Sequence, residues 1–234
     1  MCGRGVVTLS HDDIAEHFGA DPMDDDEAWD ASYNVAPSQQ VPVVGWRPGA
    51  DRPSVRTLRW GLVPHWAKDL KIGNRMTNAR VETLDEKNAF KGPLARHRCL
   101  VVFDGFYEWE SRDDGKQPYY VHPADGAPLG MAGLYSLWRG PEGVVPTVAI
   151  VTTAAHGALA EIHHRCPVVV PAADAHTWLD PNPRDASAMR DWLLALPEPD
   201  LALHPVSRDA SNVRNNRPDL IEPIELGDFA LQPG

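Results

Sequence analysis

Apolar and polar residues alternate along much of the chain, in short runs separated by glycine, proline and other turn-forming residues. Alternation with a period of two predicts half-buried strands, and continuous β-branched runs predict buried ones. Two such runs, 41–47 and 55–60, flank a Pro-Gly turn and are predicted to form a hairpin. Further strands are expected at 2–8, 99–106, 119–122, 131–138, 144–153, 168–170 and 204–207.

Helical patterns are short. Ser10 and Asp13 have the spacing of a capping box, and Gly19 is expected to end the two-turn helix that follows them. A second helix is expected over 80–91, with Asn78 at its N-terminus. Other short helices are expected at 154–163, 172–179 and 186–196. Runs of strands with scattered helices, without regular βαβ alternation, predict an α+β fold.

Composition narrows the class of protein. A chain of 234 residues that is 43% hydrophobic is expected to build one globular domain. It has neither an apolar run of membrane-spanning length nor a signal-peptide pattern. Cys2, Cys99 and Cys166 are widely spaced, which argues against a disulfide framework or a zinc site. Nucleotide-binding glycine motifs are missing from the sequence as well. We therefore expect a cytoplasmic protein that uses no metal and no cofactor.

The net charge of −11 at first argues against a nucleic-acid partner, but the charge is unevenly distributed. Residues 11–30 hold nine carboxylates and no lysine or arginine, and the rest of the chain carries only −2. Residues 45–100 hold 12 basic against 5 acidic side chains. A basic segment of this kind is compatible with a phosphate-binding surface.

The N-terminus carries a candidate nucleophile. Removal of Met1 would leave Cys2 with a free α-amine beside its thiol. These groups have pKa values of about 7.7–8.0 and about 8.5, so both hold a reactive form near neutral pH. A 1,2-aminothiol condenses with an aldehyde to a Schiff base and then to a five-membered thiazolidine. A buried structural cysteine is the alternative.

Three more segments carry candidate chemistry. Glu108 lies between two aromatic residues at the expected end of an apolar strand, where desolvation would raise its pKa toward neutrality. A strand-edge glutamate with its carboxylate in water is the alternative. His163-His164-Arg165-Cys166 fits an acid/base histidine beside an anion-binding arginine better than a metal site, although a core histidine is the default.

The stretch 60–80 has no clean period and mixes aromatic, basic and amide residues. Trp60 and Trp66 beside arginine and lysine are typical of single-stranded DNA binders, although most tryptophans lie in cores. At the end of this stretch, Asn78 and Arg80 fit either a helix cap or a phosphate contact at a helix N-terminus.

The order of these motifs resembles the SOS-response-associated peptidase (SRAP) family, the abasic-site processing proteins. The resemblance extends from residue 1 to about residue 224 and implies a single domain over 1–224, followed by a tail at 225–234. Its motifs are MCGR (1–4), YNVAP (33–37), WGLVPHWA (60–67), NARVET (78–83), FYEW (106–109), IVTTAA (150–155), EIHHRCPVV (161–169) and HPVSRDASNVRNNRPDLIEPI (204–224).

The resemblance implies a barrel-like β core with a groove for single-stranded DNA containing abasic sites, and a protein that acts as a monomer. It implies that Cys2 captures the aldehyde of the open deoxyribose as a thiazolidine. Glu108 would move protons, His163 would assist ring opening, and Asn78 would orient the sugar. The expected DNA-binding residues are Arg4, Trp66, Arg80 and Arg165. Self-removal of the N-terminal residue and an abasic-site lyase reaction are also implied.

Three features depart from the family pattern. Gly5 replaces a bulky apolar residue, which is expected to loosen the first strand. Cys166 is expected to be a second reactive thiol because it lies close to His163 in the sequence. The acidic segment 11–30 is expected to face away from the DNA.

Two alternatives stay open at the level of sequence. One is an N-terminal-nucleophile amidohydrolase or peptidase that uses the Cys2 thiol. The other is a non-covalent single-stranded DNA-binding protein in which Cys2 is structural.

Overall fold

The computed structural model describes residues 3–24, 29–47 and 49–226. Cys2 and most of the predicted tail, 227–234, lie outside the described residues. Within the described part of the chain, no helix is long and apolar enough to cross a membrane.

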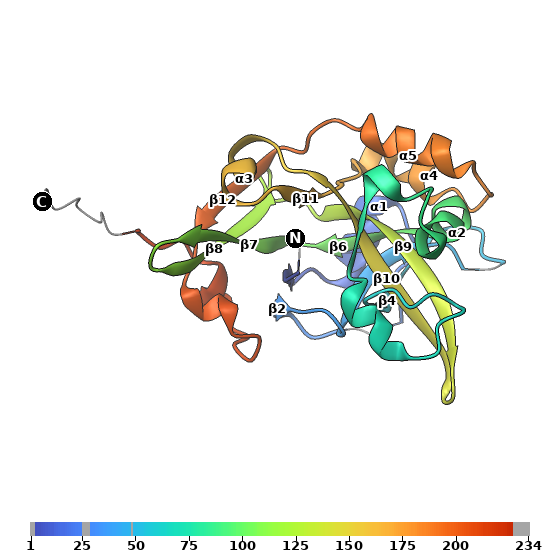
Figure 1. The fold of residues 1–234 in the computed structure, drawn as a ribbon, viewed down its shortest axis with the longest axis horizontal. Coiled ribbons are helices and arrows are strands. Elements are labelled where there is room, and N and C mark those ends of the chain that lie inside the picture. The colour runs from blue at the N-terminus through green and yellow to red at the C-terminus, as the bar shows by residue number, and fades with distance from the viewer. Residues whose placement is uncertain (1–2, 25–28, 48, 227–234) are drawn as a thin grey trace, which may run out of the picture.

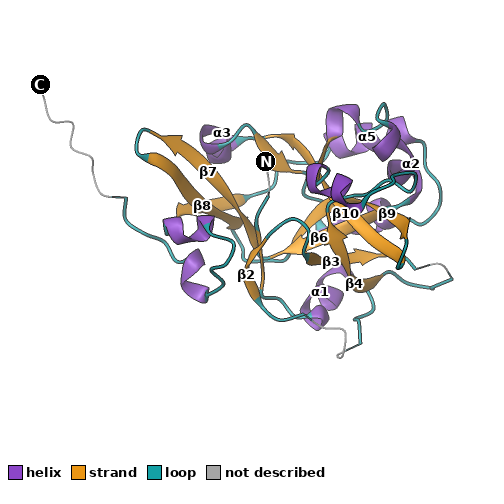
Figure 2. Ribbon diagram, turned by 60° about the horizontal axis from the view of Figure 1, so that its bottom comes forward, coloured by secondary structure: helices purple, strands orange, loops and turns teal. Residues whose placement is uncertain are grey.

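Two sheets lie side by side, and the larger one closes on itself (Figures 1 and 2). Among the described residues, the larger sheet has the strand order β11-β10-β4-β3-β6-β9, and β9 also pairs with β10. Five of its strands therefore form a closed barrel. The strands of this sheet are β3 (Gln40–Gly45), β4 (Ser54–Trp60), β6 (Arg98–Phe103), β9 (Leu129–Gly140), β10 (Gly143–Ala154) and β11 (Arg165–Pro167), with β5 (Asn78–Arg80) paired to β10.

The second sheet has the order β12-β8-β7-β1-β2 within the described residues. Figure 1 shows β7, β8 and β12 of this sheet on the left and the barrel on the right. Its strands are β1 (Gly5–Val7), β2 (Ser32–Val35), β7 (Gly105–Arg112), β8 (Gly115–Pro123) and β12 (Leu201–Pro205). These two sheets confirm the predicted α+β class and the barrel-like core.

Strand β6 shows why the barrel is stable. All six of its residues are buried, and successive side chains point to opposite faces. Leu100 and Val102 pack under the helices, while Cys99, Val101 and Phe103 pack in a second cluster with residues of β3, β4 and β9. A strand buried on both faces reads as a continuous apolar run, which is the pattern in the sequence.

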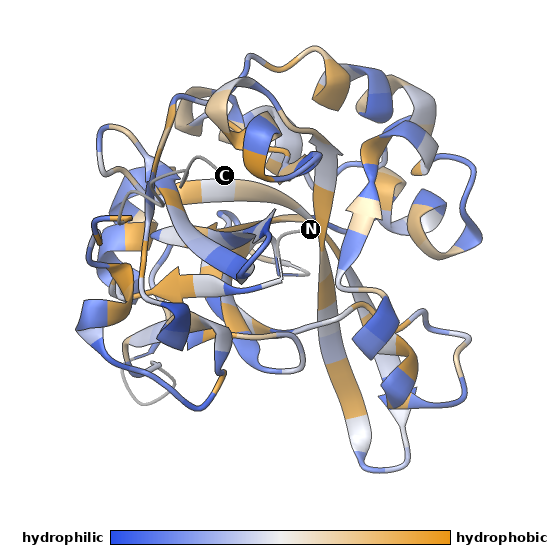
Figure 3. Cartoon of the chain, turned by 60° about the vertical axis from the view of Figure 1, so that its left-hand side comes forward, coloured by the Kyte–Doolittle hydropathy of each residue, from blue (hydrophilic) through white to orange (hydrophobic). Residues whose placement is uncertain are grey.

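Short helices cover the barrel, and α2, α4 and α5 gather at its upper right in Figure 1. Figure 3 shows hydrophilic and hydrophobic residues side by side within the surface helices, as expected for helices with one face on a core. The α-helices are α1 (His11–Phe18), α2 (Asn88–Arg96), α3 (Gly157–Ile162), α4 (Ala175–Leu179) and α5 (Ala186–Leu194). The 3-10 helices are η2 (Leu70–Arg75), η3 (Val81–Thr83), η4 (Ala172–Asp174), η5 (Arg208–Ser211) and η6 (Pro218–Ile221).

Several local predictions are confirmed. The Ser10–Asp13 capping box begins α1, and Gly19 ends it in the left-handed conformation at φ 62°. The predicted hairpin is present as β3 and β4, with Val44 opposite Val55.

The predicted helix over 80–91 is wrong, and so is the cap role of Asn78. Residues 78–80 instead form β5, which continues along the edge of β10 beyond the end of β4. Hydrogen bonds to this open strand edge, such as the one from the Ile150 N–H to the Thr77 carbonyl at 3.0 Å, outweigh a weak helical preference. The helix begins only at Asn88.

The run 99–106 is also not one strand. The chain turns at Asp104, whose carboxylate accepts a hydrogen bond from the Thr8 N–H at 2.7 Å. The first part, β6, belongs to the barrel and the second, β7, to the other sheet. Glu108 therefore lies inside β7, rather than at the end of a core strand. The predicted strand 168–170 is shifted as well: β11 lies at Arg165–Pro167, and Val169 forms only a single bridge with Met131.

Candidate functional site

Glu108 is the most deeply buried acid of the candidate site. It lies on β7 opposite Tyr119 of β8, with 2% of its surface exposed. Burial raises the pKa of its carboxyl group to about 7, because removing the carboxylate from water disfavours the charged form. Glu108 can therefore both give and take a proton near neutral pH.

His163 lies next to this carboxyl group. Its Nδ1 is 3.9 Å from Oε1 of Glu108, and the Arg165 backbone N–H donates to the same Nδ1 at 3.1 Å. The same Nδ1 also lies 3.1 Å from the Arg165 carbonyl, so the backbone of Arg165 can serve either tautomer of the ring. Burial lowers the pKa of His163, so the imidazole is neutral at pH 7.

The third segment reaches the site through β10. Asn78 on β5 pairs with Ile150, and β11 pairs with the following residues of β10, Thr152 to Ala154. The Asn78 amide nitrogen donates to Oγ1 of Thr77 at 3.2 Å. The end of β10 thus carries the Asn78 segment on one edge and the segment after His163 on the other.

Cys2 lies outside the described residues, but the chain that follows it is placed. The carbonyl of Arg4 accepts a hydrogen bond from the Tyr107 N–H at 3.0 Å, and Gly5 pairs with Phe106. Because β1 and β7 run antiparallel, the described chain begins at Gly3 beside the part of β7 that carries Glu108.

Arg4 is held by the fold itself. Its Nη1 donates to Oδ1 of Asn34 at 2.7 Å and to the Ala210 carbonyl at 3.0 Å. The Asn34 amide nitrogen donates in turn to the carbonyls of Asn212 and Asn215. The YNVAP motif therefore ties Arg4 to the C-terminal loop, a structural role that the sequence did not indicate.

Arg165 is buried, with 8% of its surface exposed. Its guanidinium binds both carboxylate oxygens of Glu82, at 2.6 and 3.0 Å, and the Thr152 carbonyl at 2.6 Å. A phosphate would have to compete with Glu82 for this side chain. Arg80 is exposed, by contrast. Glu82 is not among the residues predicted from the sequence, where its only signal is an acidic residue inside a basic stretch.

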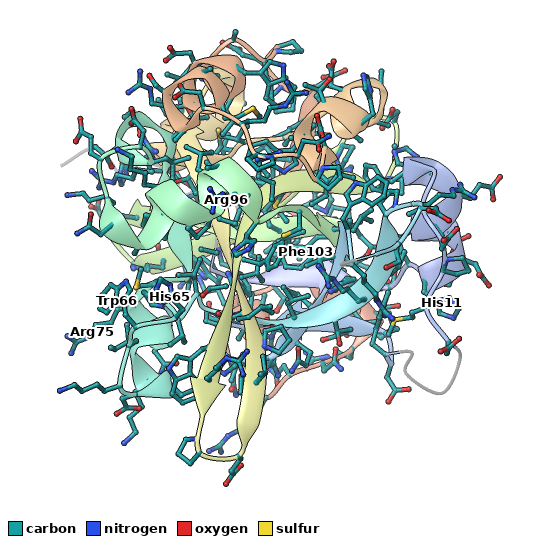
Figure 4. The ribbon with its side chains drawn as sticks, turned by 90° about the vertical axis from the view of Figure 1, so that its right-hand side faces the viewer. His11, His65, Trp66, Arg75, Arg96 and Phe103 are labelled. Atoms are coloured by element: carbon teal, nitrogen blue, oxygen red, sulfur yellow. The ribbon has the colours of Figure 1, made fainter. Side chains whose placement is uncertain are left out.

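The two tryptophans of the basic stretch differ. Trp60 is fully buried in the barrel, which is the core alternative that stayed open for it. Trp66 is 58% exposed, on a loop that is fastened where Nε1 of Trp138 donates to the Ala67 carbonyl at 2.7 Å. Figure 4 shows Trp66 with His65 and Arg75 on one flank, and His11 on the opposite side of the view.

The two unusual residues have local explanations. A Cβ at Gly5 would lie 2.3 Å from the ring of Phe103, so that ring fills the space which a side chain at position 5 would need. The Cys166 thiol is buried and donates to the Ala154 carbonyl at 3.3 Å. Burial raises its pKa to about 11, which keeps it protonated and makes it a poor nucleophile, contrary to expectation.

Within the described ranges, no three His, Cys, Asp or Glu side chains gather as metal ligands would. What the geometry brings together is a buried acid and a neutral imidazole, beside the strand that enters from the N-terminus, with the Asn78 amide on the neighbouring β5. These groups suit proton transfer and hydrogen bonding around a small polar substrate.

The sequence and the fold match a known family. Residues 1–213 match the SOS response associated peptidase (SRAP) family, and the chain belongs to it. The abasic site processing protein YoqW of Bacillus subtilis is 38% identical over 224 residues, which cover 95% of this chain and 99% of that protein. The abasic site processing protein HMCES of Gallus gallus is 36% identical over 228 residues, covering 84% of this chain and 67% of that one. The fold matches a crystal structure of a Bacteroides thetaiotaomicron protein with a TM-score of 0.81 and 24% identity, over 96% of this chain and all of the other.

Proposed function

We propose that this protein processes abasic sites in single-stranded DNA by capturing them covalently through Cys2, once Met1 has been removed. The observation that carries the proposal is the Glu108 carboxyl group, buried 3.9 Å from His163 on the strand beside the N-terminal segment. The names of the relatives, abasic site processing proteins, support the choice of substrate.

The chemistry requires a proton donor and acceptor at one place. The Cys2 amine adds to C1′ of the open deoxyribose, and the resulting hydroxyl leaves as water to give a Schiff base. The thiol sulfur then adds to the same carbon while its proton passes to nitrogen, which closes the thiazolidine. One aldehyde and one aminothiol give one ring and one water.

Glu108 is assigned the proton transfers of both steps. A carboxyl group with a pKa of about 7 can protonate the departing hydroxyl and then accept a proton from the attacking group. His163, whose imidazole is neutral at pH 7, is assigned to help open the deoxyribose ring. Asn78 is assigned to orient the sugar by hydrogen bonding.

DNA binding is assigned to the exposed Arg80 and Trp66, with Arg4 and Arg165 as further phosphate contacts. Trp66 presents a ring on which a base can stack. Arg4 and Arg165 already bind Asn34 and Glu82, so each would contact phosphate only with its remaining N–H groups or after exchanging a partner.

Two further reactions are part of the proposal. The same thiol and the same acid would remove Met1 from the chain, in line with the peptidase name of the family. A Schiff base at C1′ also permits β-elimination of the 3′ phosphate, which is a lyase reaction.

A denaturing gel tests the proposal. The mature protein is incubated with single-stranded DNA that carries one abasic site, and with the same DNA lacking it. We expect a heat-stable protein–DNA band that requires the abasic site and is absent for Cys2→Ala. Mass spectrometry of the mature chain checks that Met1 has been removed.

The other outcomes separate the alternatives. Amide hydrolysis without a covalent band would favour an amidohydrolase that uses the Cys2 thiol. Salt-sensitive binding that survives Cys2→Ala, again without a covalent band, would favour a non-covalent DNA-binding protein.

A further inference from the structure

One mouth of the barrel is occupied by cationic side chains. Leu58 and Trp60 of β4 pack inside the barrel, and Arg56 follows the same alternation toward its end. The Arg56 guanidinium lies over the Tyr135 ring, 5.2 Å from its centroid. The His97 ring stacks on Tyr135 at 4.9 Å. Mouths of β-barrels are recurrent ligand sites.

A pocket of about 410 Å³ opens here, lined in part by Trp46, Arg47, Arg96, His97 and Tyr135. Arg47 and Arg96 are exposed. We call Arg47, Arg56 and Arg96, together with the neighbouring imidazole of His97, the cationic mouth, whose positive charge comes from the three arginines.

Two acidic residues lie near the cationic mouth. The carboxylate of Asp180 lines the pocket, but it accepts hydrogen bonds from Arg184 and from the Asn182 backbone N–H. Asp51 is exposed and directly follows the turn in which the Ala50 N–H donates to the Arg47 carbonyl. The buried Arg98 guanidinium also lines the pocket, although its N–H groups are taken up by backbone carbonyls. The surroundings of the mouth therefore stay positive, which favours an anionic ligand.

The cationic mouth adjoins the Trp66 loop. Burial lowers the pKa of His97, and the neighbouring charges of Arg96 and His65 lower it further. His65 precedes Trp66 in the chain. In Figure 4, Arg96 lies on the same face as His65 and Trp66. A single DNA strand that stacks on Trp66 and continues toward Arg96 would therefore meet positive charge.

We propose that the cationic mouth is a second DNA contact, which binds backbone phosphates of the strand beyond the nucleotides held at Glu108 and Trp66. This inference rests on the proposed function. The protein would then contact a longer stretch of DNA than the reaction requires, because the cationic mouth lies outside the set of residues proposed to surround the deoxyribose. Phosphate contacts of this kind set affinity and salt dependence rather than the rate of the chemical step.

DNA length tests the proposal. Binding is measured for a short strand of about 5 nucleotides and a long one of about 25 nucleotides, each with a central abasic analogue that has no aldehyde. The variant is Arg47→Gln with Arg96→Gln. Its matched control is Arg52→Gln with Arg217→Gln, an exposed and a half-buried arginine outside the cationic mouth that are paired with Asp21 and Asp209.

For the long strand we expect the variant to bind roughly 10- to 30-fold more weakly at 0.1 M salt. Its salt slope should be smaller by about 1.4, the value for two lost phosphate contacts. The short strand should bind equally well to the variant, the control and the unchanged protein. Equal crosslinking of a short abasic strand would show that the variant is folded.

Equal losses on both strands, or none, would overturn the cationic mouth as a second contact. So would an equal loss for the control, which would indicate a general charge effect. The absence of any crosslink with the unchanged protein would instead overturn the proposed function, while the length comparison would still be readable.

Discussion

The helical cover of the barrel and the junction between the two sheets each bury a charged side chain, with opposite results. Arg98, under the helices, is 4% exposed and donates to the Trp178, Leu94, Ala95 and Asn182 carbonyls at 2.7–3.2 Å, and to that of Asp180. Its charge is met by carbonyl oxygens on every side. Burial lowers its pKa, yet a guanidinium stays protonated at physiological pH.

Glu108, at the junction, is buried to a similar degree, but burial is the largest influence on its pKa and raises it to about 7. The difference shows how a buried charged residue that stabilises the fold can be told from one that is suited to chemistry. A buried ion surrounded by fixed partners joins segments of the fold. A buried acid poised near neutrality can exchange protons, and this is the property expected of a functional site.

The largest expected effect comes from changing the acid at the junction. Glu108→Gln keeps the size of the side chain but cannot transfer the proton, so we expect crosslinking to slow by about 10²–10³-fold. Binding of DNA with an aldehyde-free abasic analogue should change little. Rates from quenched gels and affinities from fluorescence anisotropy measure the two effects. Similar losses in both would contradict proton transfer by Glu108.

The same variant reports on the cost of burying the acid. A pKa raised from 4.5 to about 7 in the folded protein means that stability is present at low pH and is lost as pH rises through 7. A glutamine side chain does not titrate, so the free energy of unfolding of Glu108→Gln minus that of wild type should increase from pH 5 to pH 8, by on the order of 2–3 kcal/mol. Urea denaturation at both pH values measures the gain.

Under the helical cover of the barrel, replacing Arg98 is expected to lower stability instead. Arg98→Leu leaves five backbone carbonyls, two of them fully buried, without their donor and should lower the free energy of unfolding by about 3–5 kcal/mol. The exposed neighbour gives the control, because Arg96→Leu should change stability by less than about 0.5 kcal/mol. Equal unfolding midpoints for the two variants would show that the carbonyl cluster does not depend on Arg98.

The smallest expected effect is on DNA binding by Trp66, with the buried Trp60 as its counterpart. Trp66→Ala should weaken binding to single-stranded DNA by about 1–3 kcal/mol and leave stability nearly unchanged, since its ring is exposed. Trp60→Ala should show the opposite pattern, with a stability loss of about 3–5 kcal/mol from the cavity in the barrel. Anisotropy titrations and urea denaturation of both proteins give the comparison.

The sequence by itself determined what depends on neighbouring residues. The capping box, the glycine end of α1, the β3–β4 hairpin and the α+β class all follow from local pattern, and the structure has each of them. Local pattern also selected Glu108 and His163 for chemistry, because their residue types and flanking residues suggested it. Their assembly at one place came only from the resemblance to a family.

Tertiary structure alone decided the rest. Residues 78–80 became a strand because β10 offered an open edge, a partner that lies about 70 residues away in the sequence. Trp60 entered the barrel while Trp66 stayed exposed, although both stand in one irregular stretch. Arg165 took Glu82 as its partner. Burial, partners and strand edges are set by contacts between distant segments, so a local pattern could not fix which arginine is paired or which acid is poised near neutral pH.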